Sequence, residues 1–273
     1  YDVYGVYAYY GAGSFNNSGT ISASASTGNA TGDSSTVYAD YVYAAYFDDE
    51  VGTFKNSGIV SAGAVAGNAE GDNSGAYAYE AYGSYFYYSP YNFTNSGTIS
   101  ASTVAGSAAG DSSRSYAYYV YGVYSDDDIG SFINSGNIIV GASAGDASGY
   151  GSYAQAYDVY GVYAYYGAGS FNNSGTISAS AAVGSAIGDS SDAYADYVYG
   201  AYFYDDVVNV FNNSGTISAS AIAGDAVGAN SYAEAYDVYG AYFYYGAGSF
   251  TNSGQISATA AAGHASGESS TVV

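Results

Sequence analysis

The sequence predicts an all-β fold, a parallel right-handed β-solenoid (β-helix) of seven coils with about 39 residues per coil and essentially no α-helix. Three observations predict it. The motif Phe-x-Asn-Ser-Gly recurs seven times at a nearly constant interval, and the residues after it alternate between apolar and polar. No stretch shows the 3.6-residue periodicity of an amphipathic helix.

The recurring motif defines the repeat unit. Successive motif phenylalanines are 39 residues apart, except for one interval of 40 before the sixth motif. Residues 1–25 recur unchanged at 157–181, which indicates identical stacking units rather than independent sites. The motif phenylalanines are Phe15, Phe54, Phe93, Phe132, Phe171, Phe211 and Phe250.

The first half of each unit predicts a turn and a half-buried strand. Asn17 and Gly19 belong to the turn, and from Ile21 to Ala25 apolar residues alternate with hydroxyl side chains. The first apolar position is predicted to point inward in every coil. This column consists of Ile21, Val60, Ile99, Ile138, Ile177, Ile217 and Ile256.

Two columns of glycine follow that strand. They begin at Gly28 and Gly32 and recur in each of the seven units. Glycine at fixed offsets is typical of corners where the backbone needs a positive φ or a close approach. We therefore expect the chain to turn at both columns.

The second half of each unit is a strand rich in tyrosine, with Val-Tyr-Gly-Val-Tyr or a close variant at its centre. Tyr43 and Tyr46 occupy this strand in the second unit. Valine and tyrosine both favour pleated, half-buried surfaces. With strands stacked about 4.8 Å apart, seven coils would form a rod about 34 Å long.

Acidic and tyrosine residues alternate along this strand from unit to unit, which doubles the period to 78 residues. The first alternating column is Asp2, Tyr41, Glu80, Tyr119, Asp158, Tyr197 and Asp237. The second, in opposite phase, is Tyr10, Asp49, Tyr88, Asp127, Tyr166, Asp205 and Tyr245. Interposed tyrosine separates like charges by about 9.6 Å instead of about 4.8 Å. We also expect its hydroxyl to donate to a carboxylate on a neighbouring rung.

Three alternatives to this architecture remain open from the sequence. Each unit could form two coils of about 19–20 residues, or the units could be independent hairpins or a low-complexity tract. The two-unit alternation favours one coil per unit, because only then are the alternating residues direct neighbours.

Residues 1–273 are interpreted as one continuous, uncapped array, and we expect them to be an excerpt of a longer one. A second copy placed head to tail would set Asp2 directly above Asp237 and break the alternation. A longer covalent array would continue with tyrosine.

Composition excludes several functions. Two Lys and Arg against 24 Asp and Glu give a formal charge of −22, which repels nucleic acid and anionic lipid. No apolar run is long enough to insert into a membrane. With no Cys and with His264 as the only histidine, neither a zinc site nor a histidine-based triad is available, so we expect no enzyme. The absence of Cys, Met and Trp suits an oxidising exterior.

Acidic clusters in alternate units are weak candidates for calcium, the one cofactor considered, because Ca²⁺ takes six to eight oxygen ligands. A solvated acidic corner that keeps the rod soluble is the favoured explanation. The candidates are Asp48, Asp49, Glu50, Asp126, Asp127, Asp128, Asp205 and Asp206. The hydroxyl columns that begin at Thr20 and Ser22 raise a remote ice-binding alternative, but the array is interrupted in units two and four.

The Asn-Ser-Gly-Thr-Ile-Ser-Ala segments, followed some twenty residues later by Val-Tyr-Gly-Val-Tyr, resemble the repetitive β-solenoid passengers of bacterial autotransporters and giant surface adhesins. The resemblance spans all seven units. It implies export, a location at the bacterial cell surface or outside the cell, and a role in adhesion or matrix building. We therefore expect an extracellular fibre, stalk or filament that associates with copies of itself. The alternative is an adhesin that binds a glycan or a partner cell, with the lone Pro90 marking a candidate site.

Overall fold

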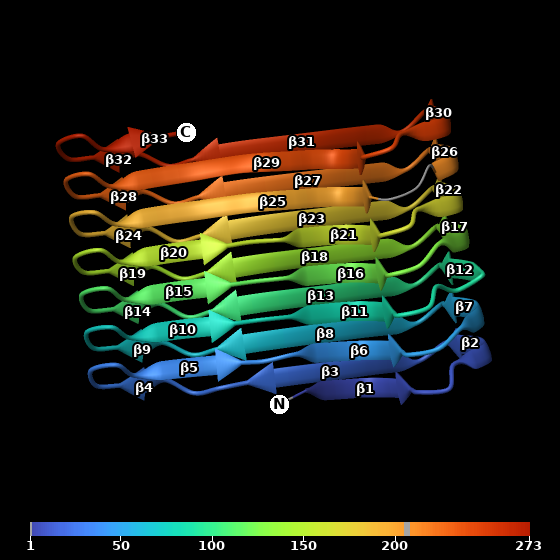
Figure 1. Cartoon of the computed structure of the whole chain (residues 1–273), viewed down its shortest axis with the longest axis horizontal. Coiled ribbons are helices and arrows are strands. Elements are labelled where there is room, and N and C mark those ends of the chain that lie inside the picture. The colour runs from blue at the N-terminus through green and yellow to red at the C-terminus, as the bar shows by residue number, and fades with distance from the viewer. Residues whose placement is uncertain (1, 205–207) are drawn as a thin grey trace.

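The structure, a computed structural model, describes residues 2–204 and 208–273. Every helix or strand assigned within these ranges is a β-strand. The chain winds through seven stacked coils, and its two ends lie at opposite ends of the stack (Figure 1). The prediction of an all-β parallel solenoid is confirmed.

The strands form four parallel sheets, each running the length of the stack. The tyrosine sheet contains β1 (Val3–Ala8), β5 (Thr36–Ala39), β6 (Val42–Phe47), β10 (Gly75–Ala78), β11 (Ala81–Phe86), β15 (Arg114–Ala117), β16 (Val120–Ser125), β20 (Tyr153–Ala156), β21 (Val159–Ala164), β25 (Asp192–Phe203), β29 (Tyr232–Phe243) and β33 (Thr271–Val272). The motif sheet contains β2 (Ala12–Asn17), β7 (Val51–Asn56), β12 (Asn92–Asn95), β17 (Ile129–Asn134), β22 (Ala168–Asn173), β26 (Val208–Asn213) and β30 (Ala247–Asn252).

The other two sheets complete each coil. The isoleucine sheet contains β3 (Thr20–Ser26), β8 (Ile59–Ala66), β13 (Thr98–Ala105), β18 (Asn137–Ala144), β23 (Thr176–Val183), β27 (Thr216–Ala223) and β31 (Gln255–Ala262). The alanine sheet contains the two-residue strands β4 (Ala30–Thr31), β9 (Ala69–Glu70), β14 (Ala108–Ala109), β19 (Ala147–Ser148), β24 (Ala186–Ile187), β28 (Ala226–Val227) and β32 (Ala265–Ser266).

Equivalent residues of successive units pair across the stack. Tyr43 pairs with Tyr82, and Ile99 pairs with Ile138, each 39 residues further on. The offset becomes 40 where Phe171 pairs with Phe211, so the extra residue is absorbed without a change of register afterwards. Each unit therefore forms one coil, and the alternative of two coils per unit is wrong.

The core lies between the tyrosine sheet and the isoleucine sheet, which pack face to face. Ile99 is fully buried and Thr98 beside it is not, so the predicted inward column is confirmed. The motif phenylalanines stack along the axis, with the Phe93 and Phe132 ring centroids 4.6 Å apart and their planes within 2°. Residues predicted as structural and found fully buried are Phe54, Phe132, Ile177, Phe211 and Ile217.

The end coils expose parts of the same columns. Phe15 and Ile21 in the first coil are partly buried against the core. Phe250 in the last coil is 54% exposed, whereas Phe211 below it is fully buried. Burial of each column therefore depends on a neighbouring coil on both sides.

The motif asparagines form a buried amide ladder. Each Nδ2 donates to the Oδ1 of the next coil's asparagine at 2.8–2.9 Å, from Asn17 at one end to Asn252 at the other. The same Nδ2 also reaches a backbone carbonyl of the next coil, as Asn56 does with the oxygen of Thr98 at 3.1 Å. These bonds satisfy buried polar groups and hold the turns in register.

The two glycine columns have different physical causes. At Gly71 the backbone has a φ of +126°, which glycine adopts without strain. At Gly67 φ does not lie in that region, but an added Cβ would lie 2.5 Å from the carbonyl oxygen of Gly28. Both predicted reasons, positive φ and close approach, are confirmed, one for each column.

Candidate functional site: tyrosine ladders and an acidic corner

The outer face of the tyrosine sheet carries an inner ladder of seven stacked rings. Its members are Tyr4, Tyr43, Tyr82, Tyr121, Tyr160, Tyr199 and Tyr239. Successive ring centroids are 4.8–5.2 Å apart and successive planes lie within 10°. Tyr82, Tyr121 and their neighbours in the middle of the stack are buried although they lie outside the main core.

An outer ladder runs beside the first. Its members are Tyr7, Tyr46, Tyr85, Tyr124, Tyr163, Tyr202 and Tyr242. Their centroids are 4.8–5.2 Å apart, and each ring meets the inner ladder edge to face, as Tyr82 meets Tyr85 at 5.2 Å and 86°. Stacked and edge-to-face pairs are both favourable arrangements of aromatic rings. The two ladders together form one continuous aromatic band.

The two ladders share a face because the strand does not alternate strictly. In β11, a Cβ on Gly83 would lie 2.5 Å from Cγ2 of Ile99, so this position faces the core. Ser84 is also fully buried, and its partner Val123 belongs to the core. Two consecutive inward positions bring Tyr82 and Tyr85 to the same side. The Val-Tyr-Gly-Val-Tyr pattern indicates this break in alternation, since glycine occupies the first of the two consecutive inward positions.

Carboxylates accept hydrogen bonds from ladder hydroxyls within one rung. The bonds join Tyr4 to Asp2 (3.3 Å), Tyr82 to Glu80 (2.6 Å), Tyr160 to Asp158 (3.4 Å), Tyr46 to Asp48 (3.2 Å) and Tyr124 to Asp126 (3.2 Å). These five donors are ladder tyrosines, so the expectation that the tyrosines of the alternating columns donate to a neighbouring rung stays a prediction. Each of these carboxylates lies one residue beyond an end of its tyrosine's strand, and the chain there brings it to the hydroxyl of its own rung.

Burial changes the protonation of this band. It raises the pKa of the Glu80 and Asp158 carboxyl groups, that of Asp158 to about 7. It likewise raises the pKa of Asp196 to about 7, where the charge of Glu234 acts in the same direction. Burial also raises the pKa of the ladder phenols in the first six coils, that of Tyr85 to about 12. These phenols are therefore neutral at pH 7, while Asp158 and Asp196 titrate close to it.

Asp196 is a buried carboxylate that sequence reasoning missed. It is 2% exposed, and its Oδ1 has no hydrogen-bond partner among the residues that the structure describes. It pairs with Tyr236 of the next coil, in a column of tyrosine and aspartate that lies beside the first alternating column. No regular alternation marks this column, which is why its burial could not be inferred from the sequence.

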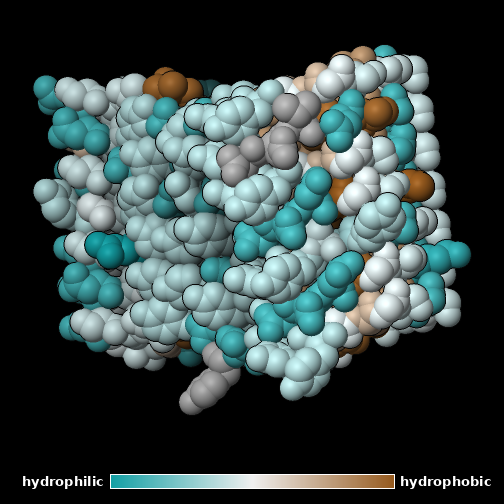
Figure 2. All heavy atoms as spheres, turned by 45° about the vertical axis from the view of Figure 1, so that its right-hand side comes forward, coloured by the Kyte–Doolittle hydropathy of each residue, from teal (hydrophilic) through white to brown (hydrophobic). Residues whose placement is uncertain are grey.

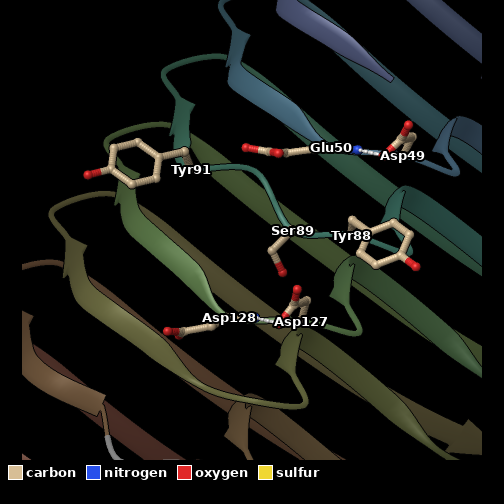
Figure 3. A pocket seen from close by; sticks show the side chains of 7 residues that line it. All are labelled: Asp49, Glu50, Tyr88, Ser89, Tyr91, Asp127 and Asp128. Carbon is tan, nitrogen blue, oxygen red and sulfur yellow. Dashed lines mark hydrogen bonds between the residues drawn. The ribbon is translucent and has the colours of Figure 1, made fainter. Parts of the chain in front are cut away.

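Acidic residues and tyrosines alternate along the corner between the tyrosine sheet and the motif sheet (Figure 2). Three shallow depressions of about 390–420 Å³ lie along it. The one at the centre is lined by Asp49, Glu50, Tyr88, Ser89, Tyr91, Asp127 and Asp128 (Figure 3). The carboxylates of Asp49 and Asp127 each accept a hydrogen bond at 2.8 Å from the next residue's amide, which shapes the turn.

Six of the eight calcium candidates lie on this corner, in coils two and four. Asp205 and Asp206 lie outside the described residues. Among residues 2–204 and 208–273, no three acidic or histidine side chains are grouped in a way that could hold a metal ion. The hydroxyl array of the isoleucine sheet is interrupted by Ile59 and Ile139, which are 46% and 48% exposed.

The third coil departs locally from the repeat. Its motif strand β12 begins only at Asn92, because Pro90 has no amide hydrogen to donate to a ladder. Tyr91 is 70% exposed at the mouth of the central depression, while Ser89 is buried with its hydroxyl against that of Ser125. Pro90 was singled out from the sequence, and the structure brings its neighbours to the acidic corner.

No known family model, curated protein or solved structure matches this chain. In the part of the chain that the structure describes, no helix is long and apolar enough to cross a membrane.

Proposed function

We propose that the chain is a rod-forming segment of an extracellular fibre, stalk or surface filament, and that it associates with copies of itself. The observation that carries this proposal is the in-register pairing of equivalent residues in every coil. Because each coil contacts mainly its neighbours, coils can be added without a change in cross-section. The solenoid fold is compatible with this structural role.

The end coils support the same proposal. A further coil stacked on the last one, from any source, would bury Phe250 as its own neighbours bury Phe211. It would also extend the asparagine ladder beyond Asn252. One more copy of the same repeat unit would make both contacts. A fibre of indefinite length requires that each added unit can do this.

We propose an extracellular location at the bacterial cell surface and no catalytic role. The sequence contains no Cys, Met or Trp, the side chains that are oxidised most readily outside the cell. Its two basic residues leave few sites for trypsin-like proteases, which favours persistence outside the cell. The charge of −22 keeps such rods soluble while they are separate.

The test is to insert one 78-residue double unit, identical to residues 79–156, after residue 156 and to image the rods by electron microscopy. We expect the rod to lengthen by about 9.6 Å at constant width, since two coils are added about 4.8 Å apart. A matched control inserts only the first 20 of those residues, which should disrupt the stack. A rod that widens, or keeps its length with the full insertion, would contradict the proposal.

One observation favours an adhesin as a second candidate. The repeat is broken locally where Tyr91 projects beside the central acidic depression. An exposed ring next to carboxylates is suited to stack on a sugar and accept its hydroxyl hydrogen bonds. A glycan array tests this, with Tyr91→Ala expected to abolish selective binding. Tyr150→Ala is the control, because Tyr150 is similarly exposed on another face.

A further inference from the structure

The two tyrosine ladders form an unbroken path from the first coil to the last. Within each ladder no two successive ring centroids are more than 5.2 Å apart. Edge-to-face contacts cross-link the ladders at each rung, as between Tyr121 and Tyr124 at 5.2 Å. Rings in van der Waals contact are close enough for an electron to pass between them.

The chain offers an oxidant few targets other than tyrosine. Trp, Cys and Met, which compete with tyrosine for loss of an electron, do not occur, whereas tyrosine occurs 39 times. An oxidising equivalent that reaches this protein therefore resides on a phenol ring. The ladders bring fourteen of those rings into contact.

Oxidation of a phenol also requires a base, because the ring loses its hydroxyl proton together with the electron. Burial raises the pKa of the Tyr82 and Tyr85 phenols, so their protons cannot leave first at neutral pH. Glu80 lies 2.6 Å from the hydroxyl of Tyr82, a short charge-assisted contact. Burial also raises the pKa of Glu80, which makes this carboxylate a better proton acceptor than one in water.

We propose that the paired ladders are a relay for one-electron oxidation, with the Tyr82–Glu80 pair as a resting place for the radical. A one-electron oxidant takes an electron from an exposed ring. The resulting electron hole then moves from ring to ring along the ladders. At Tyr82 the ring has lost one electron and its hydroxyl proton, and Glu80 has gained that proton. Return of an electron reverses the transfer, so no bond to carbon is formed or broken. The relay is independent of fibre formation.

The first experiment tests the base. The folded protein is illuminated with tris(bipyridine)ruthenium(II) and persulfate, which supply the one-electron oxidant, and then frozen for electron paramagnetic resonance. We expect Glu80→Gln to lower the surviving tyrosyl signal, because the amide cannot accept the proton and the four other carboxylate–phenol contacts of the ladders are longer, 3.2–3.4 Å. Glu70→Gln is the matched control: Glu70 is exposed and the same charge is lost. Equal signals from the two variants would overturn the role of Glu80.

The second experiment tests the path. Tyr10→Cys carries a covalently attached ruthenium sensitiser next to Tyr9, whose ring approaches Tyr7 of the outer ladder at 6.5 Å. Tyr242→Trp supplies a unique indole at the other end, and its fluorescence is lost when it is oxidised. The chain has no other Cys or Trp, so both the source and the sink are unique.

The ladders are then interrupted in the fourth coil by Tyr121→Phe with Tyr124→Phe, which keep the rings but remove the oxidisable hydroxyls. We expect loss of indole fluorescence to become several-fold slower. The control replaces two exposed tyrosines outside the ladders, Tyr91 and Tyr150, in the same way. Sedimentation of each variant establishes that the sensitiser and the indole belong to one monomer. If the interrupted and control variants lose fluorescence equally fast, the relay is refuted.

Discussion

Replacement of Asn95 by leucine should destabilise the rod mainly because buried polar groups of the adjacent coils lose their hydrogen-bond partners. Asn95 is fully buried, and so are the asparagines above and below it. Its Oδ1 accepts from Asn56 at 2.9 Å, and its Nδ2 donates to Asn134 at 2.8 Å and to the carbonyl of Asn137 at 3.1 Å. Leucine replaces none of these bonds.

The magnitude follows from what remains unsatisfied. The Nδ2 of Asn56 loses one acceptor but keeps the carbonyl of Thr98, whereas Oδ1 of Asn134 and the carbonyl of Asn137 each lose a donor. At about 1–3 kcal/mol for each of two weakened buried acceptors, the free energy of unfolding should fall by about 2–6 kcal/mol. Burial of the leucine offsets a part of this loss.

The assay is urea unfolding followed by circular dichroism, with Asn16→Leu as the matched control. Asn16 precedes a ladder asparagine in the first coil and is exposed, so its replacement should change stability by less than about 0.5 kcal/mol. Asn95→Asp keeps the shape, removes the donor and adds a charge, and should also destabilise. If the two leucine variants unfold at the same urea concentration, the amide ladder contributes nothing and the reasoning is refuted.

Three further predictions concern the core and the buried carboxyls. Ile99→Asp should lower the thermal midpoint far more than Thr98→Asp, because Ile99 is fully buried and Thr98 faces outward; equal shifts would mean that the inside and outside of this sheet are misassigned. Ser84→Ala should raise the free energy of unfolding in a urea titration by about 1 kcal/mol, because the buried hydroxyl has no partner within residues 2–204 and 208–273 and Ala45 already occupies this column; a loss of stability would argue against it. The pKa of Asp158 is raised to about 7 from an ordinary 3.8. Its stabilising contribution to the free energy of unfolding is therefore fully present below about pH 4 and is lost as the pH rises through 7. The thermal midpoint should therefore decrease as the pH is raised from about 4 to about 7, and Asp158→Asn should flatten this profile; an unchanged slope would exclude Asp158 as its source.

Several features of the fold could be predicted from the sequence because they depend only on spacing. In a parallel stack with one coil per repeat, the neighbour of each residue is its equivalent 39 positions away, so columns in the sequence become columns in space. The inward position of Ile99 and the two glycine corners followed from this rule. The candidate acidic corner followed from it as well, through the alternation of Asp49 and Tyr88.

Other features depended on the path of the backbone within one coil, which spacing does not specify. Gly83 and Ser84 both face inward, and this local break in alternation places Tyr82 and Tyr85 on one face. A strict period of two would have separated them. The hydroxyl of Tyr82 meets Glu80 on its own rung because the chain just before β11 places the carboxylate beside it, and the repeat spacing does not specify this contact. The sequence by itself thus determined which residues stack along the rod, and only the tertiary structure decided which of them touch across it.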